Sequence, residues 1–203
     1  MVFKVAVFAS GRGSDFQALL DAARLGRINV TFVGMVTDNP NALAIERARL
    51  AGVPCFVLEP SRYATRLEYD EAVFEKMEVL KPDLIVLAGY MRIIKNTGVL
   101  ENYKGKIINI HPSLLPKYPG AHAQKDAFEA KEKTSGYTIH FVDQSLDGGA
   151  IIYQEEVDIS ECKSADDVSA KILEREHIGL PMVVGWFSKG KVKLGKDGKV
   201  TIL

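Results

Sequence analysis

Apolar residues along the chain fall into short continuous runs that alternate with segments of helical spacing. The continuous runs are typical of strands that are buried on both faces of a parallel sheet. They lie at residues 2–9, 30–36, 53–58, 84–88 and 107–110. The segments of helical spacing lie near residues 16–23, 41–51 and 69–80. This order predicts right-handed crossovers and an α/β fold with a doubly wound, mostly parallel sheet.

The last third of the chain has a different pattern. Further strands are predicted at residues 137–142 and 151–157, on either side of the turn sequence DQSLDGG. Ser164 and Asp167 form a capping box that begins a long helix, and VKLGKDGKVTIL predicts a terminal hairpin. Because neither repeats nor a linker interrupt the pattern, we expect residues 1–203 to form a single domain.

The charge balance and the short apolar runs narrow the class of protein. The chain has 26 basic and 26 acidic residues, so it lacks the basic footprint typical of nucleic-acid binding. No apolar run approaches the ~20 residues of a membrane span. The N-terminal run is predicted to be a strand and not a signal peptide. We therefore expect small-molecule substrates, and neither a nucleic acid nor a membrane, as partners.

The cysteines and histidines suggest a reducing compartment and no metal. Cys55 and Cys162 stand far apart without CxxC spacing, and the histidines form no metal-binding motif. A cytoplasmic location fits this pattern. We expect no metal ion, and either a monomer or a homodimer.

Polar segments follow several of the predicted strands at the points where the strands end. They are residues 11–15, 89–92 and 109–111. In open parallel sheets, ligands bind beyond the carboxyl ends of the strands, near the switch in strand order. We therefore expect these segments to line one crevice.

The first of these segments, SGRGSD, joins a strand to a helix. Free backbone N–H groups and the helix dipole favour phosphate at such a position. The segment does not match the dinucleotide motif GxGxxG, because Phe16 occupies the third glycine position, and it does not match the P-loop. A mononucleotide-sized or sugar phosphate is the better interpretation, although glycines that serve only a tight turn would give the same pattern.

The second segment contains Arg92, whose guanidinium suits a carboxylate or a phosphate. Its apolar neighbours Met91, Ile93 and Ile94 could flank a flat heterocycle. A surface arginine beside core residues would produce the same pattern.

The third segment begins the loop NIHPSLLPKYPG, which is stiffened by prolines at 112, 116 and 119. The Asn109 amide can donate to a developing oxyanion, and His111 can polarise the same oxygen and move protons. Asp147, in SLDGG, is the candidate carboxylate that orients His111 and favours its imidazolium form. A structural histidine and an ordinary Asp-Gly turn are the alternative interpretation.

The remaining histidines, His122, His140 and His177, have no second supporting feature, and we interpret them as structural. The chain has no GxSxG motif and no cysteine near a histidine in the sequence. This favours direct transfer between two bound substrates over a covalent acyl-enzyme.

Taken together, these motifs resemble the folate-dependent formyltransferase family, and within it the enzymes that act on 5-phosphoribosyl glycinamide. The segments that carry the resemblance are SGRGS, LAGYMRII, NIHPSLLPKYPG, HFVDQSLDGG and EREH. The resemblance covers essentially the whole chain and implies a Rossmann-like formyltransferase fold. It also implies that the glycinamide amine attacks the formyl carbon of 10-formyltetrahydrofolate in purine synthesis. Relatives that carry a further N- or C-terminal domain are longer than this chain.

The resemblance also implies roles for individual residues. The catalytic set is Asn109, His111 and Asp147. The ribonucleotide-binding set is Gly11, Gly13, Ser14, Asp15 and Glu176. The folate-binding set is Arg66, Met91, Arg92, Ile93, Ile94, Asn109, Asp143 and Leu146. Residues about 1–100 are thereby expected to bind the ribonucleotide, and residues about 101–203 to bind folate and carry the catalytic groups.

Certain positions depart from the family pattern. Asp15 stands where asparagine is common, and because a carboxylate would repel phosphate, we expect Asp15 to cap the helix or to contribute its backbone N–H. Tyr137 occupies a position expected to be small, and Ser135 stands where histidine is frequent.

Other functions are compatible with part of the pattern. Water could replace the amine, which would make the protein a 10-formyltetrahydrofolate hydrolase. A nucleotide-binding or NAD-linked module could use the same glycine-rich turn, with Asp38 as the ribose-binding acid. That alternative leaves Asn109, His111 and Asp147 without a role.

Overall fold

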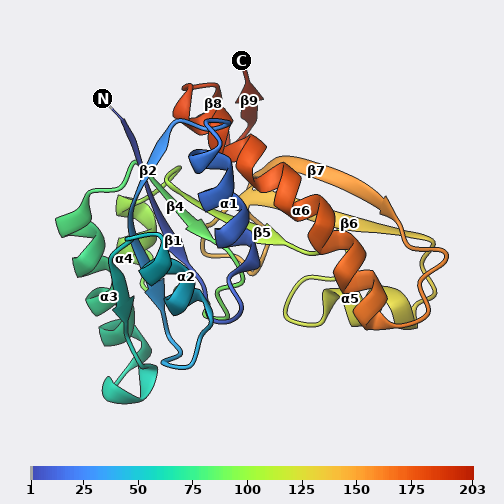
Figure 1. Cartoon of the computed structure of the whole chain (residues 1–203), viewed down its shortest axis with the longest axis horizontal. Coiled ribbons are helices and arrows are strands. Elements are labelled where there is room, and N and C mark those ends of the chain that lie inside the picture. Colours follow the sequence, from blue (N-terminus) through green and yellow to red (C-terminus); the bar gives the residue numbers. More distant parts are fainter. Residues whose placement is uncertain (1) are drawn as a thin grey trace.

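A seven-stranded sheet runs through the centre of the computed structural model, which describes residues 2–203 (Figure 1). Its strands are β1 (Phe3–Phe8), β2 (Val30–Thr37), β3 (Cys55–Val57), β4 (Leu84–Leu87), β5 (Ile107–His111), β6 (Thr134–Phe141) and β7 (Ile151–Asp158). The spatial order is β3-β2-β1-β4-β5-β6-β7. The strands β1 to β5 pair in parallel, whereas β6 pairs antiparallel to β5 and β7 antiparallel to β6. The predicted doubly wound, mostly parallel α/β sheet is confirmed.

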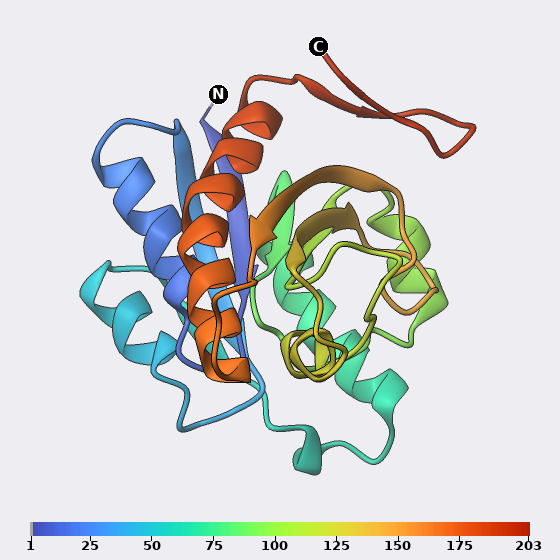
Figure 2. The ribbon, with the colours of Figure 1, turned by 90° about the vertical axis from the view of Figure 1, so that its right-hand side faces the viewer.

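Helices cover both faces of this sheet (Figures 1 and 2). They are α1 (Ser14–Arg24), α2 (Ala44–Leu50), α3 (Arg66–Leu80), α4 (Thr97–Asn102), α5 (Ala123–Glu129) and α6 (Ala165–Ser188), with a short 3-10 helix η1 (Pro60–Arg62). The predicted terminal hairpin is present as β8 (Val192–Leu194) and β9 (Val200–Ile202). Figure 2 shows the hairpin extending away from the main sheet beyond the end of α6.

The continuous apolar runs feed two separate cores, one on each face of the sheet. In β1, Val5 and Val7 belong to the core beneath α1 and α6, while Ala6 and Phe8 belong to the core beneath α3. Because successive side chains of a strand point to opposite faces, a strand covered on both sides needs apolar residues at every position.

Helices α4 and α5 lie in segments for which the sequence predicted no element. Both are short, and α4 owes its start to Asn96, whose side chain accepts the backbone N–H of Val99 at 3.1 Å. Helix α6 was predicted from about residue 165, and it continues through Pro181 to Ser188. The buried residues on either side of the proline, including Leu180 and Val183, hold this helix against the core despite the missing hydrogen bond.

Strand β6 begins at Thr134, ahead of the predicted start at residue 137. Glycine inside a strand is unfavourable, but Gly136 is required here, since a Cβ at this position would lie 2.0 Å from the Glu155 carbonyl oxygen. Strand β3 is shorter than predicted, since it keeps only three residues of the predicted run 53–58.

Both cysteines are free. Within residues 2–203, no helix combines the length and apolar character needed to cross a membrane.

Tyr137 of β6 is fully buried beneath α6, and its surroundings explain how a large residue fits. A Cβ on Gly179 of α6 would lie 1.7 Å from the Tyr137 hydroxyl oxygen, so the glycine leaves the space that the ring occupies. The hydroxyl donates to Glu155 Oε2 at 2.7 Å. Glu155 also accepts from Arg175 Nε at 2.6 Å. Tyr137 thus links β6, β7 and α6.

We predict that Gly179→Ala destabilises the fold through a clash with Tyr137. Overpacking of a well-packed core costs about 1–3 kcal/mol, which exceeds the ~1 kcal/mol that alanine gains over glycine in a helix. The midpoint of urea unfolding should therefore fall. The double variant Tyr137→Val/Gly179→Ala removes the obstacle and should recover part of the loss. If Gly179→Ala were as stable as the parent chain, this packing would be wrong.

Candidate active site

The first two polar segments meet at the carboxyl ends of β1 and β4, where the strand order reverses. The Ser10 N–H donates to the Gly89 carbonyl at 3.0 Å, and the Met91 N–H donates to Ser10 Oγ at 2.8 Å. The sequence predicted this meeting from the general rule for open sheets. The two loops therefore form one continuous floor at this edge.

The loop after β1 presents a helix start to this edge. Gly13 is the N-cap of α1 with φ 65°, and a Cβ there would lie 2.7 Å from Ala44 Cβ, so both conformation and space require glycine. Arg47 of α2 donates from Nε to the Arg12 carbonyl at 2.8 Å and fixes the loop from behind. The N–H groups of Ser14 and Asp15 belong to the first turn of α1, where backbone donors have no partner within the helix.

The expectation that Asp15 caps the helix is wrong for its side chain. The cap position is Gly13, which has no side chain to accept a hydrogen bond, and Asp15 already lies inside the first turn. The Asp15 side chain is buried instead, and its Oδ1 finds no hydrogen-bond partner within residues 2–203. The backbone N–H of Asp15 remains available, as the second part of the expectation required.

Glu176 of α6 lies close to Asp15, so the structure brings together these two members of the predicted ribonucleotide set. Burial raises the pKa of Asp15 to about 7. Burial, followed by the nearby Asp15, raises the pKa of Glu176 well above its ordinary value. His177, which we interpreted as structural, places Nε2 3.8 Å from Asp15 Oδ1. Burial, followed by the charge of Arg47, lowers the pKa of His177.

Arg92, in the second segment, forms an ion pair with Asp38 at the end of β2, with 2.6 Å between Nε and Oδ2. This hydrogen bond raises the pKa of Arg92. Met91 and Ile93 beside it are exposed, as a surface for a heterocycle would be. Ile94 differs, because its side chain is buried in the core beneath α3.

The predicted folate residue Arg66 is brought to this segment by a hydrogen bond from Nη2 to the Ile93 carbonyl. Asp70, which was not predicted from the sequence, anchors the same segment. It is buried and accepts the N–H groups of Lys95 at 2.5 Å and Asn96 at 3.0 Å. No local motif marks such a role, since it depends on where α3 packs.

Asn109 and His111 lie two residues apart on β5 and therefore share one face of the sheet. His111 Nε2 is 2.8 Å from the Tyr118 carbonyl oxygen, so Nε2 carries a proton and donates it. His111 Nδ1 faces Asp147 Oδ2 at 3.6 Å. The predicted set of amide, imidazole and carboxylate is thus assembled, with the last distance longer than a direct hydrogen bond.

Two residues with left-handed backbone hold the groups around His111. Tyr118 has φ 54° and Asp147 has φ 51°. The Tyr118 hydroxyl donates to Glu132 at 2.9 Å, and Asp147 Oδ2 accepts the Gly120 N–H at 2.8 Å. Such conformations are uncommon for residues other than glycine, although aspartate adopts them more readily than most. The proline-rich loop and the SLDGG turn are therefore fastened to each other.

His140, which we interpreted as structural, belongs to this site. In the antiparallel pairing of β5 with β6, His140 stands directly opposite Asn109. Its Nδ1 is 2.9 Å from the Phe141 carbonyl oxygen, and its Nε2 is 3.2 Å from Asn109 Nδ2. The carbonyl requires a proton on Nδ1, so Nε2 accepts from the Asn109 amide. Burial lowers the pKa of His140, which favours this neutral form.

The turn before Asp147 carries the last predicted folate residues. Asp143 Oδ1 accepts the N–H of Ser145 at 2.8 Å and stabilises the turn. Leu146 is exposed. Both predicted folate residues of this turn therefore lie in the segment that also delivers Asp147.

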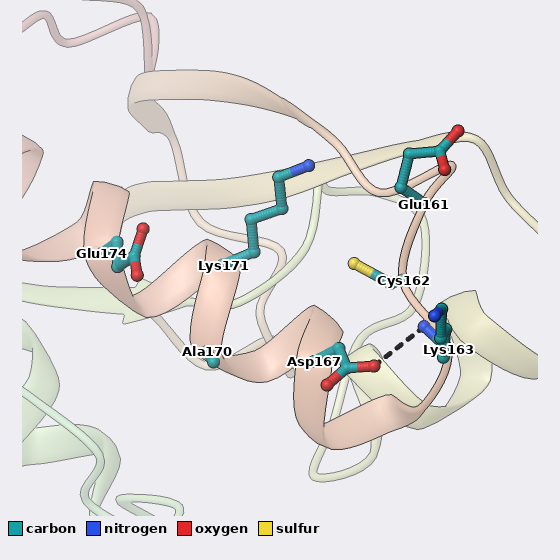
Figure 3. Close-up of a pocket in the computed structure, with 7 residues that line it drawn as sticks. All are labelled: Glu161, Cys162, Lys163, Asp167, Ala170, Lys171 and Glu174. Carbon is teal, nitrogen blue, oxygen red and sulfur yellow. Dashed lines mark hydrogen bonds between the residues drawn. The ribbon is translucent and has the colours of Figure 1, made fainter.

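Cavities elsewhere do not contain the catalytic set. Figure 3 shows one of about 400 Å³ where α6 begins, beside Cys162 and Lys171, with Asp167 accepting the Lys163 N–H. Another, of about 460 Å³, lies behind the proline-rich loop and is lined in part by Tyr118 and Glu132. Within the described residues, no group of three or more His, Cys, Asp and Glu side chains is arranged to hold a metal ion.

Comparison with known proteins places this geometry in context. The sequence model of the Formyl transferase family matches residues 3–184. Phosphoribosylglycinamide formyltransferase of Escherichia coli K12 is 38% identical over 193 residues, which cover 95% of this chain and 91% of that protein. The enzyme of the same name from Bacillus subtilis 168 is 41% identical over 181 residues, with 89% and 92% covered. The crystal structure of glycinamide ribonucleotide transformylase 1 from Symbiobacterium toebii superposes with a TM-score of 0.95 at 37% identity, with 100% and 94% covered.

We predict that His140 is neutral and carries its proton on Nδ1. At about pH 6.5, where a free histidine is half charged, the ring should stay uncharged because burial lowers its pKa. Long-range ¹H–¹⁵N NMR spectra of the histidine rings report the tautomer directly. His122 in the same chain serves as the internal control. A doubly protonated His140 ring at this pH would contradict the proposed contact with Asn109.

Proposed function

The chain belongs to the formyl transferase family, and on that premise we propose that it transfers the formyl group of 10-formyltetrahydrofolate to the amine of 5-phosphoribosyl glycinamide. The products are the formyl-glycinamide ribonucleotide and tetrahydrofolate. The reaction is a step of purine biosynthesis. The protein is a formyltransferase, and the named relatives that cover most of its length support this choice of acceptor.

One observation carries the proposal. Asn109, His111 and Asp147 converge beside the same sheet edge at which the SGRGS loop presents the start of α1. An amide donor and an imidazole suit the oxygen of a reacting formyl group, and a helix start suits a phosphate. A formyl transfer to a ribonucleotide amine needs both features within reach of each other.

The catalytic roles follow from the contacts. Asn109 has an amide with two N–H donors, and because His140 accepts one of them, the other is directed to the formyl oxygen. The amine nitrogen attacks the formyl carbon to form a tetrahedral intermediate, whose oxyanion Asn109 stabilises. His111, whose Nε2 donates to the Tyr118 carbonyl, uses Nδ1, which faces Asp147, to take the proton that the amine loses and passes it to the departing folate nitrogen. The carbon–nitrogen bond to folate then breaks.

The proposed binding residues fall into two groups, one for each substrate. Gly11, Gly13, Ser14, Asp15 and Glu176 hold the ribonucleotide. Arg66, Met91, Arg92, Ile93, Ile94, Asp143 and Leu146 form the folate side, with Asn109 between the two. Buried Ile94 acts from the core, by supporting Met91 and Ile93. In this proposal the division expected near residue 100 is not strict, because Glu176 would bind the ribonucleotide and Arg66 the folate.

The contacts of Asp38 and Phe16 argue against the alternative function as an NAD-linked module. For an NAD-linked module, Asp38 would have to bind a ribose, whereas its Oδ2 is held by Arg92 at 2.6 Å and only Oδ1 lacks a partner within residues 2–203. Phe16, at the position of the third glycine, is fully buried in the core. Hydrolysis of 10-formyltetrahydrofolate remains the outcome that an assay separates from transfer.

We predict that the purified protein consumes 10-formyltetrahydrofolate only when 5-phosphoribosyl glycinamide is present. Both substrates must be juxtaposed, and in the proposed transfer the bound amine, not water, is the nucleophile. The absorbance change on formation of tetrahydrofolate measures the rate, with and without the ribonucleotide. Equal rates in the two mixtures would identify a hydrolase and overturn the proposal.

We predict that Asp147→Asn lowers kcat about 10²-fold or more, in line with the usual contribution of acid–base groups. Asparagine tolerates the left-handed backbone at this position, and its carbonyl can still accept the Gly120 N–H. The fold should therefore survive while the charge beside His111 is lost. Asp197→Asn, in the exposed terminal hairpin, is the matched control. Near-normal kcat in Asp147→Asn would remove Asp147 from the mechanism.

A further inference from the structure

The backbone carbonyl of Tyr118 decides which nitrogen of His111 is free to act as a base. A neutral imidazole carries one N–H proton, so a proton on one ring nitrogen leaves the lone pair on the other. The Tyr118 carbonyl oxygen lies 2.8 Å from His111 Nε2, whereas Asp147 Oδ2 lies 3.6 Å from Nδ1. A carboxylate is the stronger acceptor, and without a competing carbonyl it would hold the proton on Nδ1. Nδ1 therefore stays free only while the Tyr118 carbonyl keeps its place.

Tyr118 holds this carbonyl in an unfavourable backbone conformation. Its φ of 54° is uncommon for a residue other than glycine, and such a conformation persists only when the surroundings enforce it. The Ser113 hydroxyl gives the Tyr118 carbonyl little help, because its single proton lies closer to the Lys117 carbonyl, with oxygen–oxygen distances of 2.6 Å and 3.2 Å. The Tyr118 ring packs against the edge of the core, but a cavity of about 460 Å³ lies behind the loop. The loop therefore needs a further anchor.

Glu132, in the link between α5 and β6, supplies that anchor. Its Oε1 accepts from Lys117 Nζ at 2.8 Å and from the Tyr118 hydroxyl at 2.9 Å. Two consecutive residues of the proline-rich loop thus converge on one oxygen. These bonds, with that from Lys117 the larger cause, lower the pKa of Glu132, so the group is ionised at neutral pH. Hydrogen bonds to an ionised group are the stronger kind.

The anchor itself belongs to the framework that carries His111. The Glu132 N–H donates to the Ala127 carbonyl of α5 at 3.1 Å. Strand β6 begins two residues later at Thr134, and it pairs with β5, so that Thr138 lies opposite His111. Glu132 therefore fixes the loop to the same sheet that positions the histidine.

We propose that Glu132 is a positioning residue, which acts through Tyr118 to keep the His111 proton on Nε2 and to leave Nδ1 free. Only the kinetic consequence rests on the proposed function, in which His111 Nδ1 takes the proton of the amine. When the Glu132 side chain is lost, Tyr118 relaxes toward an ordinary backbone conformation and its carbonyl turns away from Nε2. The Asp147 carboxylate then draws the proton to Nδ1, and the base is blocked.

Glu132→Ala tests the effect on the ring directly. Long-range ¹H–¹⁵N NMR spectra at about pH 8.5, where an ordinary histidine is neutral, report the tautomer of His111 without any substrate. We expect the Nε2–H form in the parent chain and a shift toward the Nδ1–H form in the variant. Tyr118→Phe removes only the hydroxyl, and it should produce a smaller shift in the same direction. Glu129→Ala is the matched control, because Glu129 is an exposed residue of α5 whose carboxylate pairs with Lys125 at 3.6 Å.

The kinetic readout separates positioning from binding. Glu132→Ala should lower kcat about tenfold or more, because a misplaced base slows the chemical step. The KM values of both substrates should change by less than about twofold, since none of the proposed binding groups is altered. Glu129→Ala should retain the kcat and the tautomer of the parent chain.

The outcomes distinguish this inference from the proposed function. If His111 keeps its proton on Nε2 in both Glu132→Ala and Tyr118→Phe, the inference is wrong, whatever happens to kcat. It is also wrong if the parent chain carries the proton on Nδ1, or if Glu129→Ala shifts the tautomer as much as Glu132→Ala does. If the tautomer shifts as expected while formyl transfer is unchanged or never observed, the positioning stands and the role given to His111 in the proposed function is wrong.

Discussion

The antiparallel pairing of β6 with β5 is the constraint on which the site depends. It sets His140 opposite Asn109, and the further antiparallel pairing of β6 with β7 makes the chain turn back after Phe141, so that the SLDGG turn brings Asp147 beside His111. A parallel strand in the same place would have needed a crossover connection and would have carried these groups elsewhere. The switch from parallel to antiparallel pairing at β5 therefore brings an amide, two imidazoles and a carboxylate together on one face of the sheet.

The polar groups of this face are held by contacts that leave few of their hydrogen-bonding atoms free to rearrange. His111 is fixed by the Tyr118 carbonyl, and the Asn109 amide by His140. Buried polar atoms that lack a partner cost free energy, so their positions are informative. The unpartnered atoms are Asp15 Oδ1, Asp38 Oδ1 and His177 Nε2 within residues 2–203. Asp15 and Asp38 follow the carboxyl ends of β1 and β2, and His177 Nε2 lies 3.8 Å from Asp15 Oδ1.

Much of the fold and part of the site could be predicted from the sequence. The continuous apolar runs predicted the parallel strands, because strands covered on both faces leave a strong local signal. Asn109, His111 and Asp147 were identified by their loops. His140 and Asp70 were not, since their roles arise from strand register and from the packing of α3, and neither leaves a motif in the chain. The departure at Tyr137 was visible in the sequence, but the compensating Gly179 lies far along the chain and only packing relates them.

Burial acts in the same direction on ionisable groups at two places near the carboxyl edge of the sheet. At His140, burial disfavours the charged ring, and the neutral ring can then accept from Asn109 and direct its amide. At Asp15 and Glu176, burial likewise disfavours the charged carboxylates. In both cases desolvation favours the uncharged form. The protonation states of His140 on β6, Asp15 on α1 and Glu176 on α6 thus follow from burial, more than from any ion pair.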